Sequence, residues 1–293
     1  MKSLNQIAAS LTNRVLVYGP PKSGKTELVG KLAQKYNLLI FDLENGVKTL
    51  RKLPDEWQSR IFPIQLPDTR DYPIAAETCN SVIKGVKGNI CSEHGKWNCP
   101  ICRKSGGEIE EICLNELNSE WIVVFDSLTQ LSNSIMAHLT RHQADLYKPE
   151  WSDYMSQGFL LDKFLSNVQQ APYNVCCITH ETETKMEDGK SKLVPVSGTA
   201  NFSRNTAKYF DDVVYCNLVN KKHVFASSTD WSNQVLTGSR SGIRLEDQDE
   251  PSLLPFFDPE YIAAKSKNIG EVSEKTKTTS RLQEILAKAK AGK

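Results

Sequence analysis

Apolar residues along this chain gather in short runs, separated by longer stretches in which they recur every three or four positions. The short runs predict buried strands at residues 14–19, 38–42, 60–66, 121–126 and 174–179. The longer stretches predict helices at residues 25–36, 72–86, 128–146 and 153–170. Strands that alternate with helices are typical of α/β proteins, in which a mostly parallel central sheet is flanked by helices.

The pattern changes in the last third of the chain. Residues 181–200 are polar and charged and end in Pro and Gly, so we expect a mobile loop there. The runs at 211–219 and 222–227 predict an antiparallel pair that closes the sheet. We therefore expect one core, residues 1–257, followed by a flexible basic tail, residues 258–293. This tail is interpreted either as a solvated segment or as a segment that binds a partner or nucleic acid.

Composition narrows the class of protein only a little. Hydrophobic residues make up 39% of the chain and charged residues 24%, which is ordinary for a globular protein. A net charge of +1 argues against a uniformly positive surface but leaves room for a local basic groove. We see no apolar run of the roughly 18 residues that a membrane span needs, and no signal-like start. The expectation is a cytoplasmic protein without membrane contact.

The clearest chemistry is the stretch GPPKSGKT at residues 19–26, which follows a predicted strand and opens a predicted helix. A glycine-rich turn in this place aims backbone N–H groups at phosphate oxygens, and the helix N-terminus adds its positive dipole end. Lys25 is expected to reach the β- and γ-phosphates of ATP, and Thr26 to ligate Mg²⁺. The residues expected to bind the nucleotide are Gly19, Pro20, Pro21, Lys22, Ser23, Gly24, Lys25, Thr26 and Glu27.

Acidic residues follow two other predicted strands. Asp126 ends the run WIVVFD, and we expect it to face the phosphate loop and hold Mg²⁺ together with Thr26. The alternative is that Asp126 caps the helix that follows. In FDLENG, Asp42 and Glu44 lie two residues apart, and a carboxylate there can orient an attacking water. A plain charged loop beside Gly46 is the alternative interpretation.

The stretch CSEHGKWNCPIC holds four metal-type ligands within twelve residues. Thiolates and imidazole at this spacing converge on one tetrahedral ion, and four protein ligands leave no open position for catalysis. The sequence therefore predicts a structural Zn²⁺ site in an insertion at residues 88–107, with Cys113 as the replacement ligand if His94 points elsewhere. The predicted ligands are Cys91, His94, Cys99 and Cys102.

In this order, the stretches GPPKSGKT, FDLENG, WIVVFDSLTQL and VCCITHETE resemble the motifs of the RecA-like core ATPases. The likeness is greatest to the phage nucleotide-binding proteins of the shortened-recombinase (Sak) type, with bacterial RadA-like proteins further away. It covers roughly residues 10 to 245. It implies a RecA-like P-loop NTPase fold and ATP hydrolysis, with Lys25 and Asp126 at the Mg-nucleotide and Glu44 as the hydrolytic base.

The same resemblance gives roles to the end of the strand at 174–179 and to the loop after it. His180 takes the position of the residue that senses the γ-phosphate, with Glu181 beside it, although most relatives in the recombinase branch carry Asn-Gln there. A strand-end cap is the alternative for His180. Residues 181–200 correspond to a DNA-binding loop, or else form a solvated loop. The lysines expected to meet phosphates there are Lys185, Lys190 and Lys192.

The stretch TGSRSGIRL resembles the Lys-x-Arg element with which such proteins reach into a neighbour's ATP site. Arg240 fits the arginine position, while Gly238 stands where the lysine would be. If Arg240 acts in trans, hydrolysis needs a homo-oligomer, either a ring or a filament. A surface arginine is the alternative interpretation.

These motifs lead to one function and two alternatives. The first is an ATP-dependent protein that binds single-stranded DNA and promotes annealing or recombination. The second is a nucleotide kinase with a zinc-bearing lid. Here, however, the predicted zinc-binding insertion precedes Asp126 and offers only Arg103 to phosphates. The third is an ATP-gated helicase-loading or adaptor protein. The tail is also a candidate contact for a single-strand-binding protein.

Overall fold

The computed structural model describes residues 12–144, 146–186, 189–219, 222–229, 232, 234–248 and 250–258. The chain divides into two units, Met1–Phe257 and Asp258–Lys293. Apart from Asp258, the expected basic tail lies outside the described residues. The first unit is described below.

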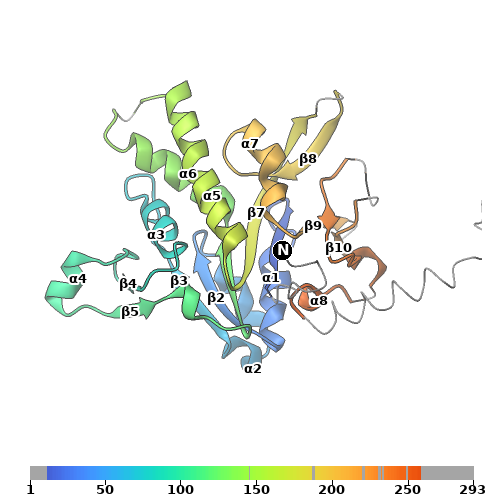
Figure 1. Ribbon diagram of the computed structural model, residues 1–293, viewed down its shortest axis with the longest axis horizontal. Coiled ribbons are helices and arrows are strands. Elements are labelled where there is room, and N and C mark those ends of the chain that lie inside the picture. The colour runs from blue at the N-terminus through green and yellow to red at the C-terminus, as the bar shows by residue number, and fades with distance from the viewer. Residues whose placement is uncertain are drawn as a thin grey trace, which may run out of the picture. The chain divides into compact units, whose positions relative to one another are not determined.

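In the described part of the first unit, a nine-stranded sheet forms the centre (Figure 1). Its strands are β1 (Arg14–Gly19), β2 (Asn37–Asp42), β3 (Ile61–Gln65), β6 (Trp121–Asp126), β7 (Asn174–Lys185), β8 (Ser191–Pro195), β9 (Asp212–Val219), β10 (Lys222–Ala226) and β11 (Gly238–Ser239). The main order is β10-β9-β1-β7-β6-β2-β3, in which only β10 runs antiparallel to its neighbour. The short strands β8 and β11 pair with β7 and β9. The predicted α/β fold with a mostly parallel sheet is confirmed.

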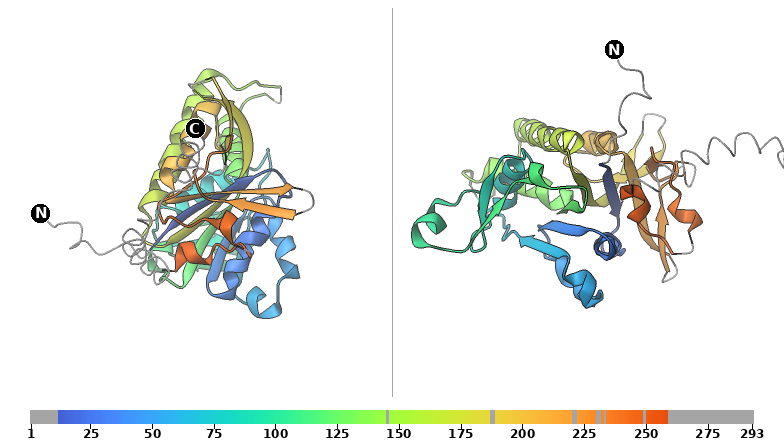
Figure 2. Two further views of the ribbon diagram at one scale, coloured as in Figure 1. Left: turned by 90° about the vertical axis from the view of Figure 1, so that its right-hand side faces the viewer. Right: turned by 60° about the horizontal axis from the view of Figure 1, so that its bottom comes forward.

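Helices cover both faces of the sheet, as the turned views show (Figure 2). The α-helices of the core are α1 (Lys25–Gly30), α2 (Asp55–Gln58), α3 (Ile74–Val82), α5 (Leu128–Thr140), α6 (Trp151–Gln170), α7 (Ala200–Asn205) and α8 (Leu254–Phe257). Short 3₁₀ helices lie at Lys31–Gln34, Gly46–Lys52, Leu114–Glu116, Thr206–Tyr209 and Leu245–Asp247. Among the described residues, no helix combines the length and the apolar content that a bilayer crossing requires.

Each central strand supplies residues to two separate hydrophobic cores, because successive side chains of a strand point to opposite faces. On β1, Val15 and Val17 join the core under α1 and α8, whereas Leu16 and Tyr18 join the core under α3, α5 and α6. A strand that is buried on both faces reads as a continuous apolar run. Burial on both faces therefore explains the apolar runs from which these strands are predicted.

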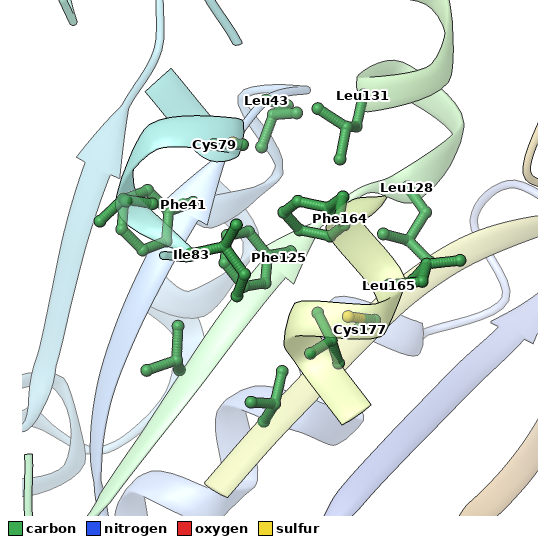
Figure 3. Packing of buried hydrophobic residues seen from close by; sticks show 14 of the residues in the cluster. Phe41, Leu43, Cys79, Ile83, Phe125, Leu128, Leu131, Phe164, Leu165 and Cys177 are labelled. Atoms are coloured by element: carbon green, nitrogen blue, oxygen red, sulfur yellow. The ribbon is translucent and has the colours of Figure 1, made fainter. Parts of the chain in front are cut away.

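The larger core is centred on three phenylalanines (Figure 3). Phe41 of β2 stacks on Phe125 of β6 with ring centroids 5.1 Å apart. Phe164 of α6 meets the same Phe125 ring edge-on at 5.0 Å. Offset and edge-to-face arrangements of this kind are the favoured geometries of aromatic pairs. Helix α6 is thereby fixed against the strand that ends in Asp126.

Several predicted boundaries were too generous. The helix expected at 128–146 ends at Thr140, and the one expected at 72–86 covers only Ile74–Val82. The helix expected at 25–36 is α1 followed by a 3₁₀ turn. Apolar spacing identifies a helix but not the residue at which tertiary contacts end it.

The expectation of a mobile loop at 181–200 is wrong. Strand β7 continues to Lys185 and pairs antiparallel with β8, from Glu181 opposite Pro195 to Lys185 opposite Ser191. Helix α7 then begins at Ala200, capped by the Thr199 hydroxyl. Alternating Thr and Glu residues on β7 leave one face of this hairpin free to pack, and Thr184 and Val194 are buried on it. The charged composition of the segment obscured that pattern.

Burial of Phe164 is expected to hold α6 in place. Phe164→Ala should lower the free energy of unfolding by about 3–5 kcal/mol, because it leaves a cavity between two other rings. Phe159 lies on the same helix and is 69% exposed, whereas Phe164 is fully buried, so Phe159→Ala is the matched control. Its effect should stay within about 0.5 kcal/mol. Urea unfolding followed by circular dichroism measures both, and equal losses would contradict this packing.

Candidate nucleotide site and metal centre

The parallel register brings the sequence-predicted residues to one edge of the sheet. Gly19 at the end of β1 pairs with His180 on β7, and Asp126 at the end of β6 pairs with Asp42 on β2. β7 lies between β1 and β6. The carboxyl ends of four neighbouring strands therefore meet where an open α/β sheet binds its ligand.

The phosphate loop connects β1 to α1 through unusual backbone conformations. Lys22 and Gly24 both have positive φ, 64° and 92°, and Ser23 N–H closes the turn onto the Pro20 carbonyl at 3.3 Å. The Lys25 ammonium is buried and donates to the carbonyls of Gly19 (3.0 Å) and Pro20 (2.7 Å). Burial lowers the pKa of Lys25, while the neighbouring Cys216 and acidic groups act in the opposite direction.

Thr26 and Asp126 form the pair expected at a Mg²⁺ ion. The Thr26 hydroxyl donates to Asp126 Oδ2 at 2.8 Å. Gly46 approaches this pair closely, because a Cβ added there would lie 3.3 Å from Asp126 Oδ2 and 3.6 Å from Thr26 Oγ1. One hydroxyl and one carboxylate oxygen fit Mg²⁺, which keeps several waters and takes few protein ligands. Burial raises the pKa of Asp126 to about 6.

The helix-cap interpretation of Asp126 is wrong. Ser127, the next residue, caps α5 by accepting a hydrogen bond from the Gln130 N–H at 3.2 Å. The Asp126 carboxylate is therefore not used by the helix and remains at the phosphate loop. Ser127 directly follows the strand, so a search for helix caps in the sequence could have found it.

Asp42 and Glu44 have different surroundings, although they are two residues apart. The Asp42 carboxylate turns back onto its own loop and accepts hydrogen bonds from the N–H groups of Glu44, Gly46 and Val47. It is buried and fixes the loop that places Gly46 beside Asp126. Glu44 instead projects toward the site. Asp42 is thus a structural residue, and Glu44 is the available carboxylate.

Two partners hold the Glu44 carboxylate. The Ser127 hydroxyl donates to its Oε1, and the ring Nε2 of His180 lies 3.4 Å from its Oε2. Burial by itself would raise the pKa of Glu44, but the hydrogen bonds from His180 and Ser127 outweigh it and leave the pKa below its usual value. Glu44 is therefore ionised at neutral pH and can accept a hydrogen bond from a water.

His180 is fixed from two sides. Its backbone N–H donates to the Thr129 hydroxyl on α5 at 3.0 Å, and its ring contacts Glu44. Its backbone carbonyl accepts from the Val196 N–H at 2.8 Å, just beyond β8. His180 therefore joins Glu44 to the β7–β8 hairpin (residues 174–195), a more specific arrangement than a strand-end cap.

Two residues at the phosphate loop were missed in the sequence. Cys216 on β9 and His223 on β10 both reach the Ser23 carbonyl, at 3.0 Å and 2.8 Å. They lie about two hundred residues from the loop in sequence and belong to no recognised motif. We find no sequence signal that would have identified them.

Arg240 does not join the site. Its backbone N–H donates to the carbonyl of Asp211, which precedes β9, and its guanidinium donates to the Asp211 carboxylate. That carboxylate also forms an ion pair with Arg14 at the start of β1. These contacts place Arg240 at the amino edge of the sheet, opposite the phosphate loop. The side chain is 66% exposed.

The four predicted metal ligands converge in a small separate sheet. Strands β4 (Gly88–Cys91) and β5 (Ile109–Ile112) pair antiparallel, and α4 (Pro100–Ser105) lies between them in sequence. The ligand atoms lie within 4.8 Å of one another, and Nδ1 of the histidine is 3.2–3.8 Å from the three sulfurs. Tetrahedral Zn²⁺ separates its ligand atoms by about 3.5–3.8 Å, so the set fits zinc. The candidate ligands are Cys91, His94, Cys99 and Cys102.

The electrostatics at Cys99 favour metal binding, and Cys113 is not needed for it. The backbone N–H of Cys102 is the main influence that lowers the pKa of the Cys99 thiol, and zinc binds the thiolate form. Cys113 lies outside the four-residue group and donates instead to the Gly85 carbonyl at 3.3 Å. His94 points at the three sulfurs, so the condition under which Cys113 is expected to replace it is not met.

The metal-binding insertion is fastened to the core through α3. The Thr78 hydroxyl donates to the Gly95 carbonyl at 2.7 Å, and Lys96 forms an ion pair with Glu77 at 3.7 Å. Trp97 packs over Gly88, where a Cβ would lie 2.0 Å from the indole ring. Because β5 closes the small sheet, the folded insertion extends past residue 107 to Ile112.

A family model described as an AAA domain matches residues 11–241. Among solved structures, the chain is similar to a prototypical ATPase from the type III secretion system of pathogenic bacteria, at 14% sequence identity and a TM-score of 0.39. That match covers 71% of this chain and 52% of the other, so the chain spans about half the length of that protein. No curated protein matches the sequence.

Replacement of Asp126 is expected to stabilise the metal-free protein. The pKa of Asp126 in the folded protein, about 6, lies above its ordinary value of 3.8, so folding favours the protonated form. The stability that protonation gives is complete below pH 4 and lost as pH rises through 6. Asp126→Asn should therefore raise the free energy of unfolding at pH 7.5 by about 1–3 kcal/mol, and by less at pH 5. Urea unfolding at both pH values tests this, with Glu120→Gln as control, and a variant destabilised at both would contradict it.

Loss of zinc is expected to unfold the insertion and to leave the phosphate loop able to bind nucleotide. The wild-type protein should contain about one zinc ion per chain. Cys102→Ser should remove this zinc and lower the midpoint temperature of unfolding. Cys113→Ser is the matched control and should keep both, because its thiol lies outside the ligand set. Metal analysis, thermal unfolding and titration with a fluorescent ATP analogue measure these effects. Loss of nucleotide binding in the folded Cys102→Ser protein would show that the insertion supports the phosphate loop.

Proposed function

This chain belongs to the AAA domain family and is a P-loop ATPase, and from that premise we propose that it couples ATP hydrolysis to the binding of single-stranded DNA. In this proposal the protein anneals or recombines the DNA, as the shortened-recombinase (Sak) proteins do. The motifs of this chain resemble those of that family. The observation that carries the proposal is the continuity of β7. One strand runs from the nucleotide edge, through His180, into the paired β7–β8 hairpin.

The first part of the proposal concerns how ATP is held. Lys25 exchanges its bonds to the Gly19 and Pro20 carbonyls for phosphate oxygens, and the backbone N–H groups of the loop surround the same phosphates. Thr26 and Asp126 hold Mg²⁺, which when bound neutralises charge on the phosphate oxygens. The charges of the buried Asp126 carboxylate and the buried Lys25 ammonium are thereby both compensated. This makes nucleotide binding favourable at this edge of the sheet.

The second part concerns the attacking water. Glu44 is ionised and held by Ser127 and His180, so its carboxylate is fixed in direction before the nucleotide arrives. A carboxylate with a low pKa is a weak base, and its main contribution is to orient and polarise the water in line with the γ-phosphate. His180 bonds the same carboxylate, so a change at the γ-phosphate alters the contact between His180 and Glu44.

The third part concerns the DNA contact. The lysines of the β7–β8 hairpin are distributed over both of its faces. Lys192 is paired with Thr184 on the face that meets Arg204 of α7, and Lys185 is paired with Ser191 on the other face. Lys185 and Lys190 are exposed, and Lys192 is partly exposed. We infer that a single strand of DNA contacts these three lysines through its phosphates.

The fourth part concerns assembly. Arg240 is exposed at the amino edge of the sheet and cannot serve the phosphate loop of its own chain. Used as a finger, it would act on a neighbour's ATP in a homo-oligomeric ring or filament. The basic tail is proposed as the contact for a single-strand-binding protein.

The test is ATP hydrolysis with and without single-stranded DNA, alongside DNA binding measured over a range of salt concentrations. Wild-type hydrolysis should rise with DNA. A triple variant, with Lys185, Lys190 and Lys192 changed to Gln, should lose this stimulation. A plot of the logarithm of its DNA association constant against the logarithm of salt concentration should be less steep, by about 2. Glu44→Gln is the matched control, because it should bind ATP and DNA normally and hydrolyse at least about a hundredfold more slowly. A wild-type protein that neither binds DNA nor responds to it would refute the DNA part.

A further inference from the structure

The Ser23 carbonyl in the phosphate loop accepts hydrogen bonds from two side chains of the β9–β10 hairpin. The Cys216 thiol donates at 3.0 Å, and the His223 ring lies with Nδ1 2.8 Å from the same oxygen. Because a carbonyl oxygen only accepts, Nδ1 carries the hydrogen in this contact. Both strands are added to the sheet beside β1, so the hairpin stands next to the loop.

The two glycines of the phosphate loop are also pressed against this hairpin. A Cβ at Gly24 would lie 2.8 Å from Cε1 of His223, and a Cβ at Gly19 would lie 1.8 Å from the Cys216 carbonyl oxygen. Gly24 has φ +92° and Gly19 has φ +154°. The loop therefore needs glycine at these positions both for its own turn and for the approach of the hairpin.

The bonded carbonyl belongs to the peptide that joins Ser23 to Gly24. A peptide unit is planar and trans, so its C=O and N–H point in opposite directions. When the hairpin holds the Ser23 carbonyl, it also directs the Gly24 N–H away from the hairpin. The N–H groups of such a loop are the donors that receive phosphate oxygens, and the carbonyl would repel them.

We propose that Cys216 and His223 are positioning residues of the nucleotide site, which fix the Ser23–Gly24 peptide so that the Gly24 N–H receives the phosphates of a nucleoside triphosphate. This rests on the proposed role of the loop in ATP binding and adds the residues that pre-organise it. The bonds are made before the nucleotide arrives, so they reduce the ordering that binding requires. The Ser23 hydroxyl is buried and, in the described part of the chain, has no hydrogen-bond partner, so the loop keeps an unused donor.

The test compares three replacements of His223. In His223→Asn a side-chain N–H stands close to the position of Nδ1–H, whereas in His223→Gln the N–H moves one carbon further out. His223→Leu removes the donor. Loss of one such hydrogen bond should weaken ATP binding about fivefold to tenfold and leave kcat nearly unchanged, because it affects bound substrate and transition state alike. The Asn variant should stay close to wild type, and the Leu and Gln variants should be weakened.

Equilibrium titration with a fluorescent ATP analogue gives Kd, and steady-state hydrolysis without DNA separates KM from kcat. His142→Leu is the matched control, because that histidine bonds Arg141 and does not touch the loop. Equal affinities in all variants, or equal weakening by Asn and Gln, would overturn the proposal. Should the Leu variant fail to fold, the comparison of Asn with Gln still decides. A wild-type protein that binds no ATP would instead count against the proposed function.

Discussion

The parallel register of β1, β7, β6 and β2 is the constraint on which the site depends. β1 ends opposite His180 of β7, β6 ends two residues away opposite Ile178, and β2 ends opposite Asp126. This register brings the phosphate loop, His180 and Asp126 to a single edge. Backbone hydrogen bonds set this register, and the apolar side chains of two cores prevent a slip, because a shift by one residue would turn every buried side chain to the wrong face. The chemistry of the site therefore rests on the packing of the sheet.

Charge at that edge is arranged for a ligand more than for the stability of the empty protein. The ammonium of Lys25 is buried against backbone carbonyls, and Asp126 is buried with a raised pKa. Glu44, by contrast, is kept ionised by its hydrogen bonds. Two carboxylates with opposite pKa shifts in one site are a common sign of separate roles, here the metal binding proposed for Asp126 and the activation of water proposed for Glu44. Functional sites are often less stable than the rest of the fold for this reason.

The metal-binding insertion is braced against the helices that support the site. Glu77 of α3 pairs with Lys96 of the insertion and also with Arg141, which directly follows α5. Helix α5 begins beside Asp126; its N-cap Ser127 bonds Glu44, and its Thr129 bonds His180. The insertion and the nucleotide edge are thus linked through α3 and α5. A closed ligand set suits a structural ion that maintains such a brace.

The sequence by itself determined the seven strands of the main sheet order, the phosphate loop and the Cys/His cluster, because each depends on residues that are close together in the chain. Apolar runs, a glycine turn and Cys-x2-Cys spacing are all local. Only the tertiary structure separated Asp42 from Glu44, placed Arg240 at the opposite edge, and brought His223 onto the phosphate loop. Those outcomes follow from strand order and from contacts between residues up to two hundred positions apart, which no local pattern encodes.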